Sequence, residues 1–112
     1  MARAHRYGAA AEATAAAYLQ TLGFAIVARN FRAPDGEIDI IARDGATIVF
    51  IEVKARMTRA FGSPLSAVDH RKRARIRAVA ADYLQFAAPD LKARFDVLAI
   101  SGTGLRLYRN AF

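Results

Sequence analysis

The spacing of apolar residues along this chain alternates between a helical and a strand-like pattern. Apolar residues that recur every three or four positions predict an amphipathic helix, and short β-branched runs bounded by turn residues predict strands. The resulting order is helix, three strands, helix, two strands. This order predicts an α/β protein with a five-stranded mixed sheet flanked by helices. The predicted helices are residues 7–22 and 69–86, and the predicted strands are residues 24–28, 37–43, 48–54, 95–101 and 105–109.

A hairpin is predicted between the second and third strands. Asp44-Gly45 is a strong signal for a two-residue turn between strands. The turn also sets the register, and a shift by a single residue would send Asp39 to the opposite face of the sheet. A turn made of Asp44 and Gly45 predicts the cross-strand pairs Arg43–Ala46, Asp39–Phe50 and Glu37–Glu52.

An acid and a base lie two residues apart in the third predicted strand, at Glu52 and Lys54. Residues two apart on a strand point to the same side, and the predicted register adds Asp39 to that face. Asp39 and Glu52 are then diagonal neighbours at roughly 7–8 Å, a gap that a divalent cation can close. The three side chains therefore predict a site. An ordinary ion pair at a strand end, with Asp39 solvated nearby, explains the same pattern equally well.

Composition narrows the classes of protein to consider. The 112 residues are 54% hydrophobic and 24% charged, which predicts one globular domain spanning residues 1–112. The formal net charge of +7 and the pI of about 10.6 favour a polyanionic partner, such as nucleic acid. The absence of cysteine excludes disulfides, thiolate nucleophiles and cysteine zinc sites. We expect a cytoplasmic location and no membrane interaction, since no signal-peptide or membrane-spanning pattern is present.

Basic residues concentrate at the start of the second predicted helix and in the loop before it. Such a run is often simply a solvated helix face. Here it follows the predicted site closely, and contacts to backbone phosphates position a protein on nucleic acid without reading sequence. The candidate phosphate-binding residues are Arg56, Arg59, Arg71, Lys72, Arg73 and Arg75.

Several short motifs together give the chain a family resemblance. They are Arg6-Tyr7-Gly8 with Glu12, Gly36-Glu37-Ile38-Asp39, Phe50-Ile51-Glu52-Val53-Lys54, Phe61-Gly62-Ser63-Pro64, Lys72, and Phe95-Asp96-Val97. With these motifs the chain resembles the YraN-like family of small bacterial proteins, which are distantly similar to archaeal Holliday-junction resolvases. The resemblance covers nearly the whole chain. It implies a restriction-endonuclease-like core and an active site of the type acid…acid-x-lysine.

The resemblance also implies roles for particular residues. Asp39 and Glu52 would be the metal-binding carboxylates, and Lys54 would lie beside the attacking water. Glu12 would be a helix acid near the metal, although a glutamate early in a helix is also favoured by the helix dipole alone. Lys72 would lie near the catalytic face.

The expected chemistry is phosphodiester hydrolysis. Hard oxygen ligands select Mg²⁺ or Mn²⁺, and Asp39, Glu52 and the backbone carbonyl of Val53 form a suitable set. Lys54 can orient the water, accept its proton or stabilise the charge that develops on phosphate. We therefore expect a metal-dependent endonuclease that acts on DNA, including branched DNA, and a homodimer is compatible with this function. The alternatives are a non-catalytic nucleic-acid-binding module of the same fold and an adaptor for another protein.

Overall fold

The helices and strands form in the predicted order, α-β-β-β-α-β-β. The computed structural model describes residues 2–55, 69–87, 90–102 and 104–112, with side chains described from residue 10 onward. No helix in this part of the chain is long and apolar enough to cross a membrane. The elements are α1 (Ala2–Thr21), β1 (Ala25–Ala33), β2 (Gly36–Asp44), β3 (Thr47–Ala55), α2 (His70–Ala87), β4 (Lys92–Ser101) and β5 (Gly104–Tyr108).

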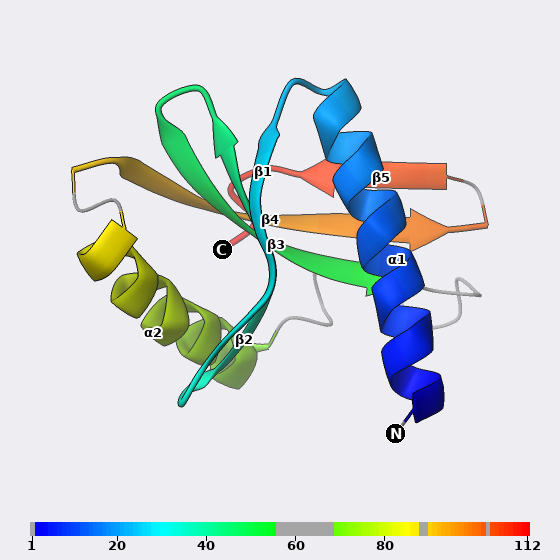
Figure 1. Ribbon diagram of the computed structural model, residues 1–112, viewed down its shortest axis with the longest axis horizontal. Helices are drawn as coiled ribbons and strands as arrows, with labels where there is room; N and C mark the ends of the chain where they lie inside the picture. Colours follow the sequence, from blue (N-terminus) through cyan, green and yellow to red (C-terminus); the bar gives the residue numbers. More distant parts are fainter. Residues whose placement is uncertain (1, 56–68, 88–89, 103) are drawn as a thin grey trace.

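The strands of the described residues form one mixed sheet with the spatial order β1-β2-β3-β4-β5. Neighbouring strands are antiparallel except for β3 and β4, which are parallel. The parallel pair is possible because α2 lies between these strands in the sequence. Figure 1 shows the long β1–β2 hairpin reaching past the rest of the sheet towards the first half of α2.

The predicted register of the β2–β3 hairpin was wrong by one residue on each strand. The structure pairs Asp44 with Thr47 and Arg43 with Ile48, so Gly45 and Ala46 form the turn. Gly45 has a φ of 61° and takes the first turn position, as in a type II′ turn, whereas the prediction gave it the second. The predicted pairs Arg43–Ala46, Asp39–Phe50 and Glu37–Glu52 therefore do not form, and Ile41 lies opposite Phe50.

Several boundaries also differ from the prediction: α1 begins at Ala2 rather than at residue 7, β4 begins at Lys92 rather than at residue 95, and the end of β1 differs most among the strands. β1 continues to Ala33 and pairs there with Gly36, so that only Pro34 and Asp35 form the turn. The predicted strand ended at residue 28, and the residues after it include the turn formers Asn30, Pro34 and Gly36. Pairing across the hairpin overrides this local preference and carries both strands beside α2.

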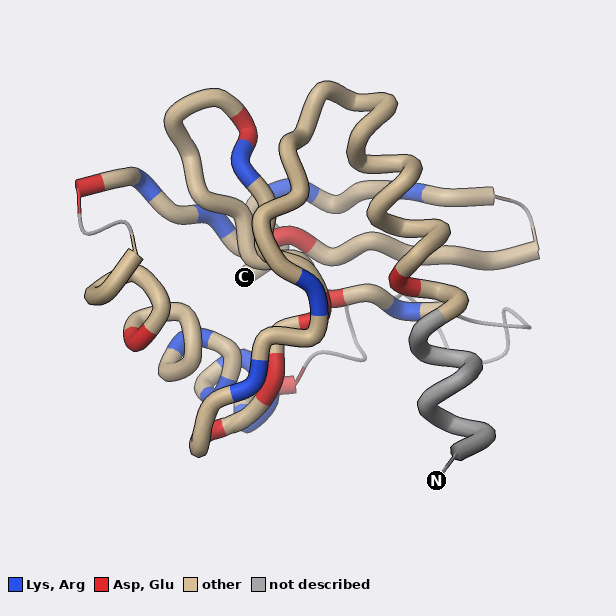
Figure 2. Tube along the Cα trace, viewed as in Figure 1, with Lys and Arg blue, Asp and Glu red and all other residues tan. Residues whose placement is uncertain are grey.

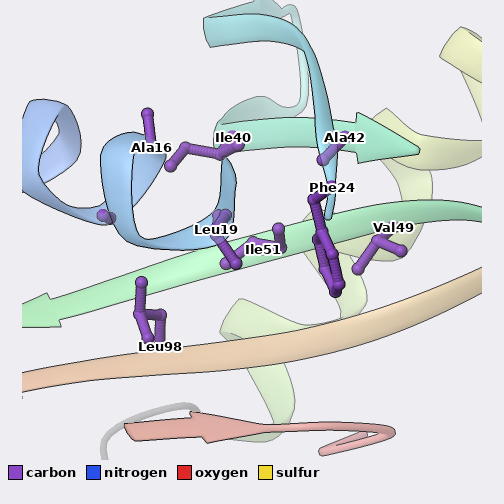
Figure 3. Close-up of a cluster of buried hydrophobic side chains, with 9 residues drawn as sticks. Ala16, Leu19, Phe24, Ile40, Ala42, Val49, Ile51 and Leu98 are labelled. Carbon is purple, nitrogen blue, oxygen red and sulfur yellow. The ribbon is translucent and has the colours of Figure 1, made fainter. Parts of the chain in front are cut away.

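Two hydrophobic clusters cover the two faces of the sheet. On one face, Leu19 of α1 packs with Phe24, Ile40 and Ile51, as Figure 3 shows. The other face packs against α2 through a second cluster, which is Ile38, Ile41, Ile48, Phe50, Ile76, Val79, Ala80 and Val97. The sheet is therefore a central layer with one helix on each side, and its inner strands are buried on both faces.

A buried ion-pair network holds the β2–β3 turn end of the sheet. Asp96 is fully buried and accepts hydrogen bonds from Arg94 Nε at 3.0 Å and from the Asn110 amide at 3.0 Å. Arg94 also contacts Asp44 at 3.0 Å. This network ties β4 to the β2–β3 turn and to the residues after β5, and it uses none of the predicted site residues.

Candidate functional site

Asp39 lies where β2 separates from β3. The β2–β3 ladder ends at the pair of Ile40 with Ile51, and beyond it Asp39 Oδ2 accepts the amide hydrogen of Val53 at 2.8 Å. The usual alternation of side chains also breaks here, since Ile38 packs in the cluster on the α2 side and Ile40 in the cluster on the α1 side. A carboxylate thus occupies the fork between two strands, and the backbone of β3 fixes its position.

Glu52 meets two lysines from different elements. Its Oε1 lies 2.7 Å from Lys72 Nζ of α2 and 3.6 Å from Lys54 Nζ of β3. Asp69 caps α2, since its Oδ1 accepts the Lys72 amide hydrogen at 2.9 Å. This cap fixes the start of α2 and places Lys72 in its first turn. Glu52 itself is buried, so its charge is compensated by ammonium groups rather than by water.

Asp39 also belongs to a cluster of three acids. Glu12, Glu37 and Asp39 each offer a carboxylate oxygen, and these three oxygens all lie within 4.8 Å of one another. Glu12 has 6% of its surface exposed, and its Oε1 is a buried oxygen without a hydrogen-bond partner among the described residues. This spacing is compatible with a bound metal ion. We call Glu12, Glu37 and Asp39 the acidic cluster.

Two residues of this region were not predicted as site residues. Glu37 was expected opposite Glu52, but it lies beside Glu12 and Asp39 instead. Asn30 lies opposite Asp39 in the β1–β2 ladder, between the pairs Arg29–Ile40 and Phe31–Ile38. It has a φ of 55°, and its side chain hydrogen-bonds Glu12. Asparagine tolerates positive φ, but the predicted strand ended at residue 28, so Asn30 was not expected beside the site.

The close acids change one another's protonation. Burial raises the pKa of Asp39 from 3.8 to about 7, and repulsion from the Glu52 carboxylate adds to the shift. A hydrogen bond between these two carboxyl groups also favours protonated Asp39. Burial likewise raises the pKa of Glu12, which the hydrogen bond to Asn30 partly offsets. Both groups thus resist carrying a negative charge unless a cation joins them.

The two lysines are shifted in opposite directions. Burial lowers the pKa of Lys54, and the neighbouring Lys72 lowers it further. Burial also works against the charged form of Lys72, but hydrogen bonds to Glu52 and Lys54 outweigh it and raise its pKa. The pKa of Lys72 therefore lies above that of Lys54. Opposite shifts in neighbouring groups are typical of sites that transfer protons.

A cavity of about 260 Å³ opens between the β1–β2 hairpin and α2. Its lining combines acids of β2 and β3 with bases of α2: Gly36, Glu37, Asp39, Glu52, Lys72, Arg75 and Ile76. The hairpin backbone packs directly against α2, because a Cβ added at Gly36 would lie 3.7 Å from the Arg75 Cβ. A small anionic group that entered this cavity would meet carboxylates and cationic side chains together.

The remaining predicted basic residues, and the neighbouring Arg77 that was not among them, lie in different surroundings. Arg73 is placed over the Phe112 ring and Arg77 over both Phe95 and Phe112, so these guanidinium groups face an aromatic surface. Arg71 is exposed at the start of α2. Figure 2 shows the concentration of Lys and Arg positions along the first half of this helix. Arg56 and Arg59 lie outside the described residues.

Sequence comparisons identify the family. The model of the Uncharacterised protein family UPF0102 matches residues 11–100. A UPF0102 protein of Shewanella loihica is 46% identical over 105 residues, covering 94% of this chain and 92% of its own length. A UPF0102 protein of Moorella thermoacetica is 49% identical over 96 residues, covering 85% of this chain and 80% of its own length. The chain therefore belongs to the UPF0102 family, which confirms the resemblance to YraN-like proteins.

Proposed function

We propose that this protein is a divalent-cation-dependent endonuclease-like hydrolase that cleaves phosphodiester bonds in DNA. The observation that carries the proposal is the meeting of Asp39, from the β2–β3 fork, with the Glu52 carboxylate and its two lysines. This arrangement supplies hard oxygen ligands, a lysine of lowered pKa and cationic groups within one region. The alternative of an isolated ion pair does not explain why Asp39 is held beside it.

The residues present fit a bound divalent cation. Asp39 and Glu52 would hold it, with the Val53 carbonyl as a further oxygen ligand. Two observations favour this fit: the carboxyl groups of Asp39 and Glu52 share a hydrogen bond, and burial and repulsion raise the pKa of Asp39. When bound, Mg²⁺ or Mn²⁺ lowers the pKa of a coordinated water and neutralises charge on the phosphate.

Lys54 and Lys72 would have different roles in the reaction. Burial and Lys72 lower the pKa of Lys54, which suits it to accept a proton from the attacking water. Lys72 keeps its charge through its contact with Glu52, so it can stabilise negative charge that develops on the phosphate. Neither step requires a residue outside the cavity and its immediate neighbours.

The cavity also suggests how a DNA strand is held. Lys72 and Arg75 are three residues apart on α2, so they lie on the same face of the helix, and both line the cavity with Asp39 and Glu52. Arg75 has no ion-pair partner within the described ranges. We assign backbone-phosphate contacts to Lys72 and Arg75. Such contacts bind DNA without sequence preference, which suits recognition by shape, as for branched DNA.

One observation favours a second function, nucleic-acid binding without cleavage. Glu52 already has two ammonium partners, so the site can satisfy this buried charge without a metal ion. A protein of this kind would bind DNA through the same basic surface and leave it intact.

A cleavage assay separates the two functions. Labelled duplex, forked and four-way-junction DNA are incubated with the wild type, Lys54→Met or Lys92→Met in Mg²⁺ or Mn²⁺. Lys92 is an exposed lysine of β4 and serves as the matched control. If hydrolysis occurs at this site, the cleavage rate of Lys54→Met should be at least about 100-fold below that of the wild type. The cleavage rate of Lys92→Met should equal that of the wild type. Binding without cleavage by the wild type on every substrate would favour the second function.

A further inference from the structure

We propose that the acidic cluster forms a second divalent-cation site, with Glu37 as a ligand, and that Asp39 is shared between this site and the first one. The inference deepens the proposed function, because it rests on that function for the first cation, at Asp39 and Glu52. The second site would take a hard cation such as Mg²⁺, Mn²⁺ or Ca²⁺. Its ligands come from two different elements: Glu12 from α1, and Glu37 and Asp39 from β2.

The dimensions of the cluster suit one ion. Its three oxygens all lie within 4.8 Å of one another. Ligand oxygens lie about 2.0–2.6 Å from these cations, so two ligands of one ion are separated by up to roughly twice that length. The Glu52 oxygens are not members of this group, although Glu52 lies next to Asp39. One cation therefore cannot be assigned to all four acids with the side chains as they lie.

Within the described part of the site, the carboxyl groups that lack an ion-pair partner are those of Glu12 and Asp39, which are both members of the acidic cluster. Glu52 has two ammonium partners, Lys54 and Lys72. Neither Glu12 nor Asp39 has an ion-pair partner in the part of the chain that the structure describes. A buried carboxylate without a cation is costly, and the absence of compensation is greatest at the acidic cluster.

A separate observation is the unsatisfied oxygen of Glu12. Only 6% of the Glu12 surface is exposed, so the residue is more than nine-tenths buried. Its Oε1 has no hydrogen-bond partner among the described residues. Its side chain otherwise bonds to Asn30, which holds it in place. Buried polar atoms normally have a hydrogen-bond partner. A buried oxygen that has none and lies beside two other carboxylates is therefore suited to bind a cation.

Glu37 completes the site from the solvent side. Its side chain is 39% exposed, and its Oε2 contacts Arg32 Nε at 3.1 Å, which engages only one of its two oxygens. Glu37 also lines the cavity beside Asp39 and Glu52. A cation can therefore reach the cluster through the same opening that would admit a phosphate. This access distinguishes Glu37 from Glu12, which is buried beneath it.

The test counts Mn²⁺ ions bound in the absence of DNA, by electron paramagnetic resonance of the free ion. The wild type is expected to bind two ions, Glu37→Gln and Glu52→Gln one each, and Asp39→Asn none. Asp35→Asn removes an exposed acid from the same hairpin and is expected to retain both ions. Glu12→Gln is a second test of the cluster and is expected to retain one ion. Circular dichroism shows that each variant is folded.

The two proposals fail in different ways. A Glu37→Gln protein that keeps the wild-type number of ions would overturn the second site. A wild type that binds a single ion and cleaves DNA overturns this inference and leaves the proposed function standing. A wild type that binds two ions, one of them lost in Glu37→Gln, supports the inference even when no DNA is cleaved.

Discussion

The carboxylate of Asp39 replaces a strand-to-strand hydrogen bond, because its Oδ2 accepts the Val53 amide hydrogen at 2.8 Å just past the end of the β2–β3 ladder. A backbone donor thus holds a potential metal ligand in place. An asparagine oxygen can accept the same hydrogen bond, so Asp39→Asn removes the charge while leaving this contact possible. The relationship makes Asp39→Asn more informative than a truncation to alanine.

The stability of the metal-free protein should depend on pH through Asp39. Burial and repulsion from Glu52 raise the pKa of Asp39 from 3.8 to about 7 in the folded protein. A raised carboxyl pKa means that the folded state holds its proton more tightly than the unfolded state. The contribution to stability is therefore fully present below about pH 4 and is lost as the pH rises through about 7. Thermal unfolding in EDTA between about pH 4 and 8 measures this loss.

The matched variant for this prediction is Asp39→Asn, which cannot titrate. Its midpoint temperature should change less between about pH 5 and 8 than that of the wild type. Added Mn²⁺ should stabilise the wild type more at the upper end of this range, since the ion competes with the proton on Asp39. Parallel curves for the two proteins would show that Asp39 has an ordinary pKa.

The basic residues of α2 should separate into two functional groups. Arg75 lines the cavity, whereas Arg77 lies over the rings of Phe95 and Phe112 at 5.8 Å. Arg75→Ala should weaken DNA binding and reduce the steepness of its salt dependence by about 0.9 in log–log slope, the value for one lost phosphate contact. Arg77→Ala removes the same charge but should leave that slope nearly unchanged.

Fluorescence anisotropy over a salt series measures both slopes. Chemical denaturation measures the free energy of unfolding of the same two variants. Arg77→Ala should lower the free energy of unfolding by about 0.5–1 kcal/mol through its lost aromatic contacts. Arg75→Ala should have a smaller effect on unfolding. Equal slopes for Arg75→Ala and Arg77→Ala would argue against a phosphate contact at Arg75.

The ion-pair network of Asp96, Arg94 and Asp44 at the β2–β3 turn should contribute to the stability of the fold and not to metal binding. Asp96→Ala leaves the largely buried Arg94 without its main partner, since Arg94 Nε and Nη2 lie 3.0 and 3.1 Å from Asp96 oxygens. Breaking a buried pair in this way should cost about 3–5 kcal/mol of unfolding free energy. Urea denaturation measures the loss. Mn²⁺ affinity of the folded variant should be unchanged, and a large fall in affinity would link this network to the site.

The fold was largely accessible from sequence because each element has its own local signal. The apolar run of β3 and the helical spacing of apolar residues in α2 predicted both elements to within one residue at each end. The β2–β3 register was less accessible. A glycine at the first rather than the second turn position moves every pair by one residue on each strand, and Asp-Gly is compatible with either placement.

The acidic cluster could not be derived from strand periodicity. That argument assumes that side chains alternate along β2, but the alternation breaks between Ile38 and Ile40. The positive φ of Asn30 on the opposite strand accompanies this break, and the change brings Glu37 beside Glu12. Long-range twist of a hairpin is a tertiary property, so the sequence pointed to Asp39, Glu52 and Lys54 but not to Glu37.

The most direct test of the central claim is single-turnover cleavage of labelled four-way-junction and duplex DNA by the wild type and Asp39→Asn, each in Mn²⁺ and in EDTA. We predict cleavage by the wild type in Mn²⁺ only. Asp39→Asn should show a rate at least about 100-fold lower, with its folding and DNA affinity retained. Cleavage by Asp39→Asn at the wild-type rate, or cleavage that persists in EDTA, would contradict a metal-dependent site built on Asp39.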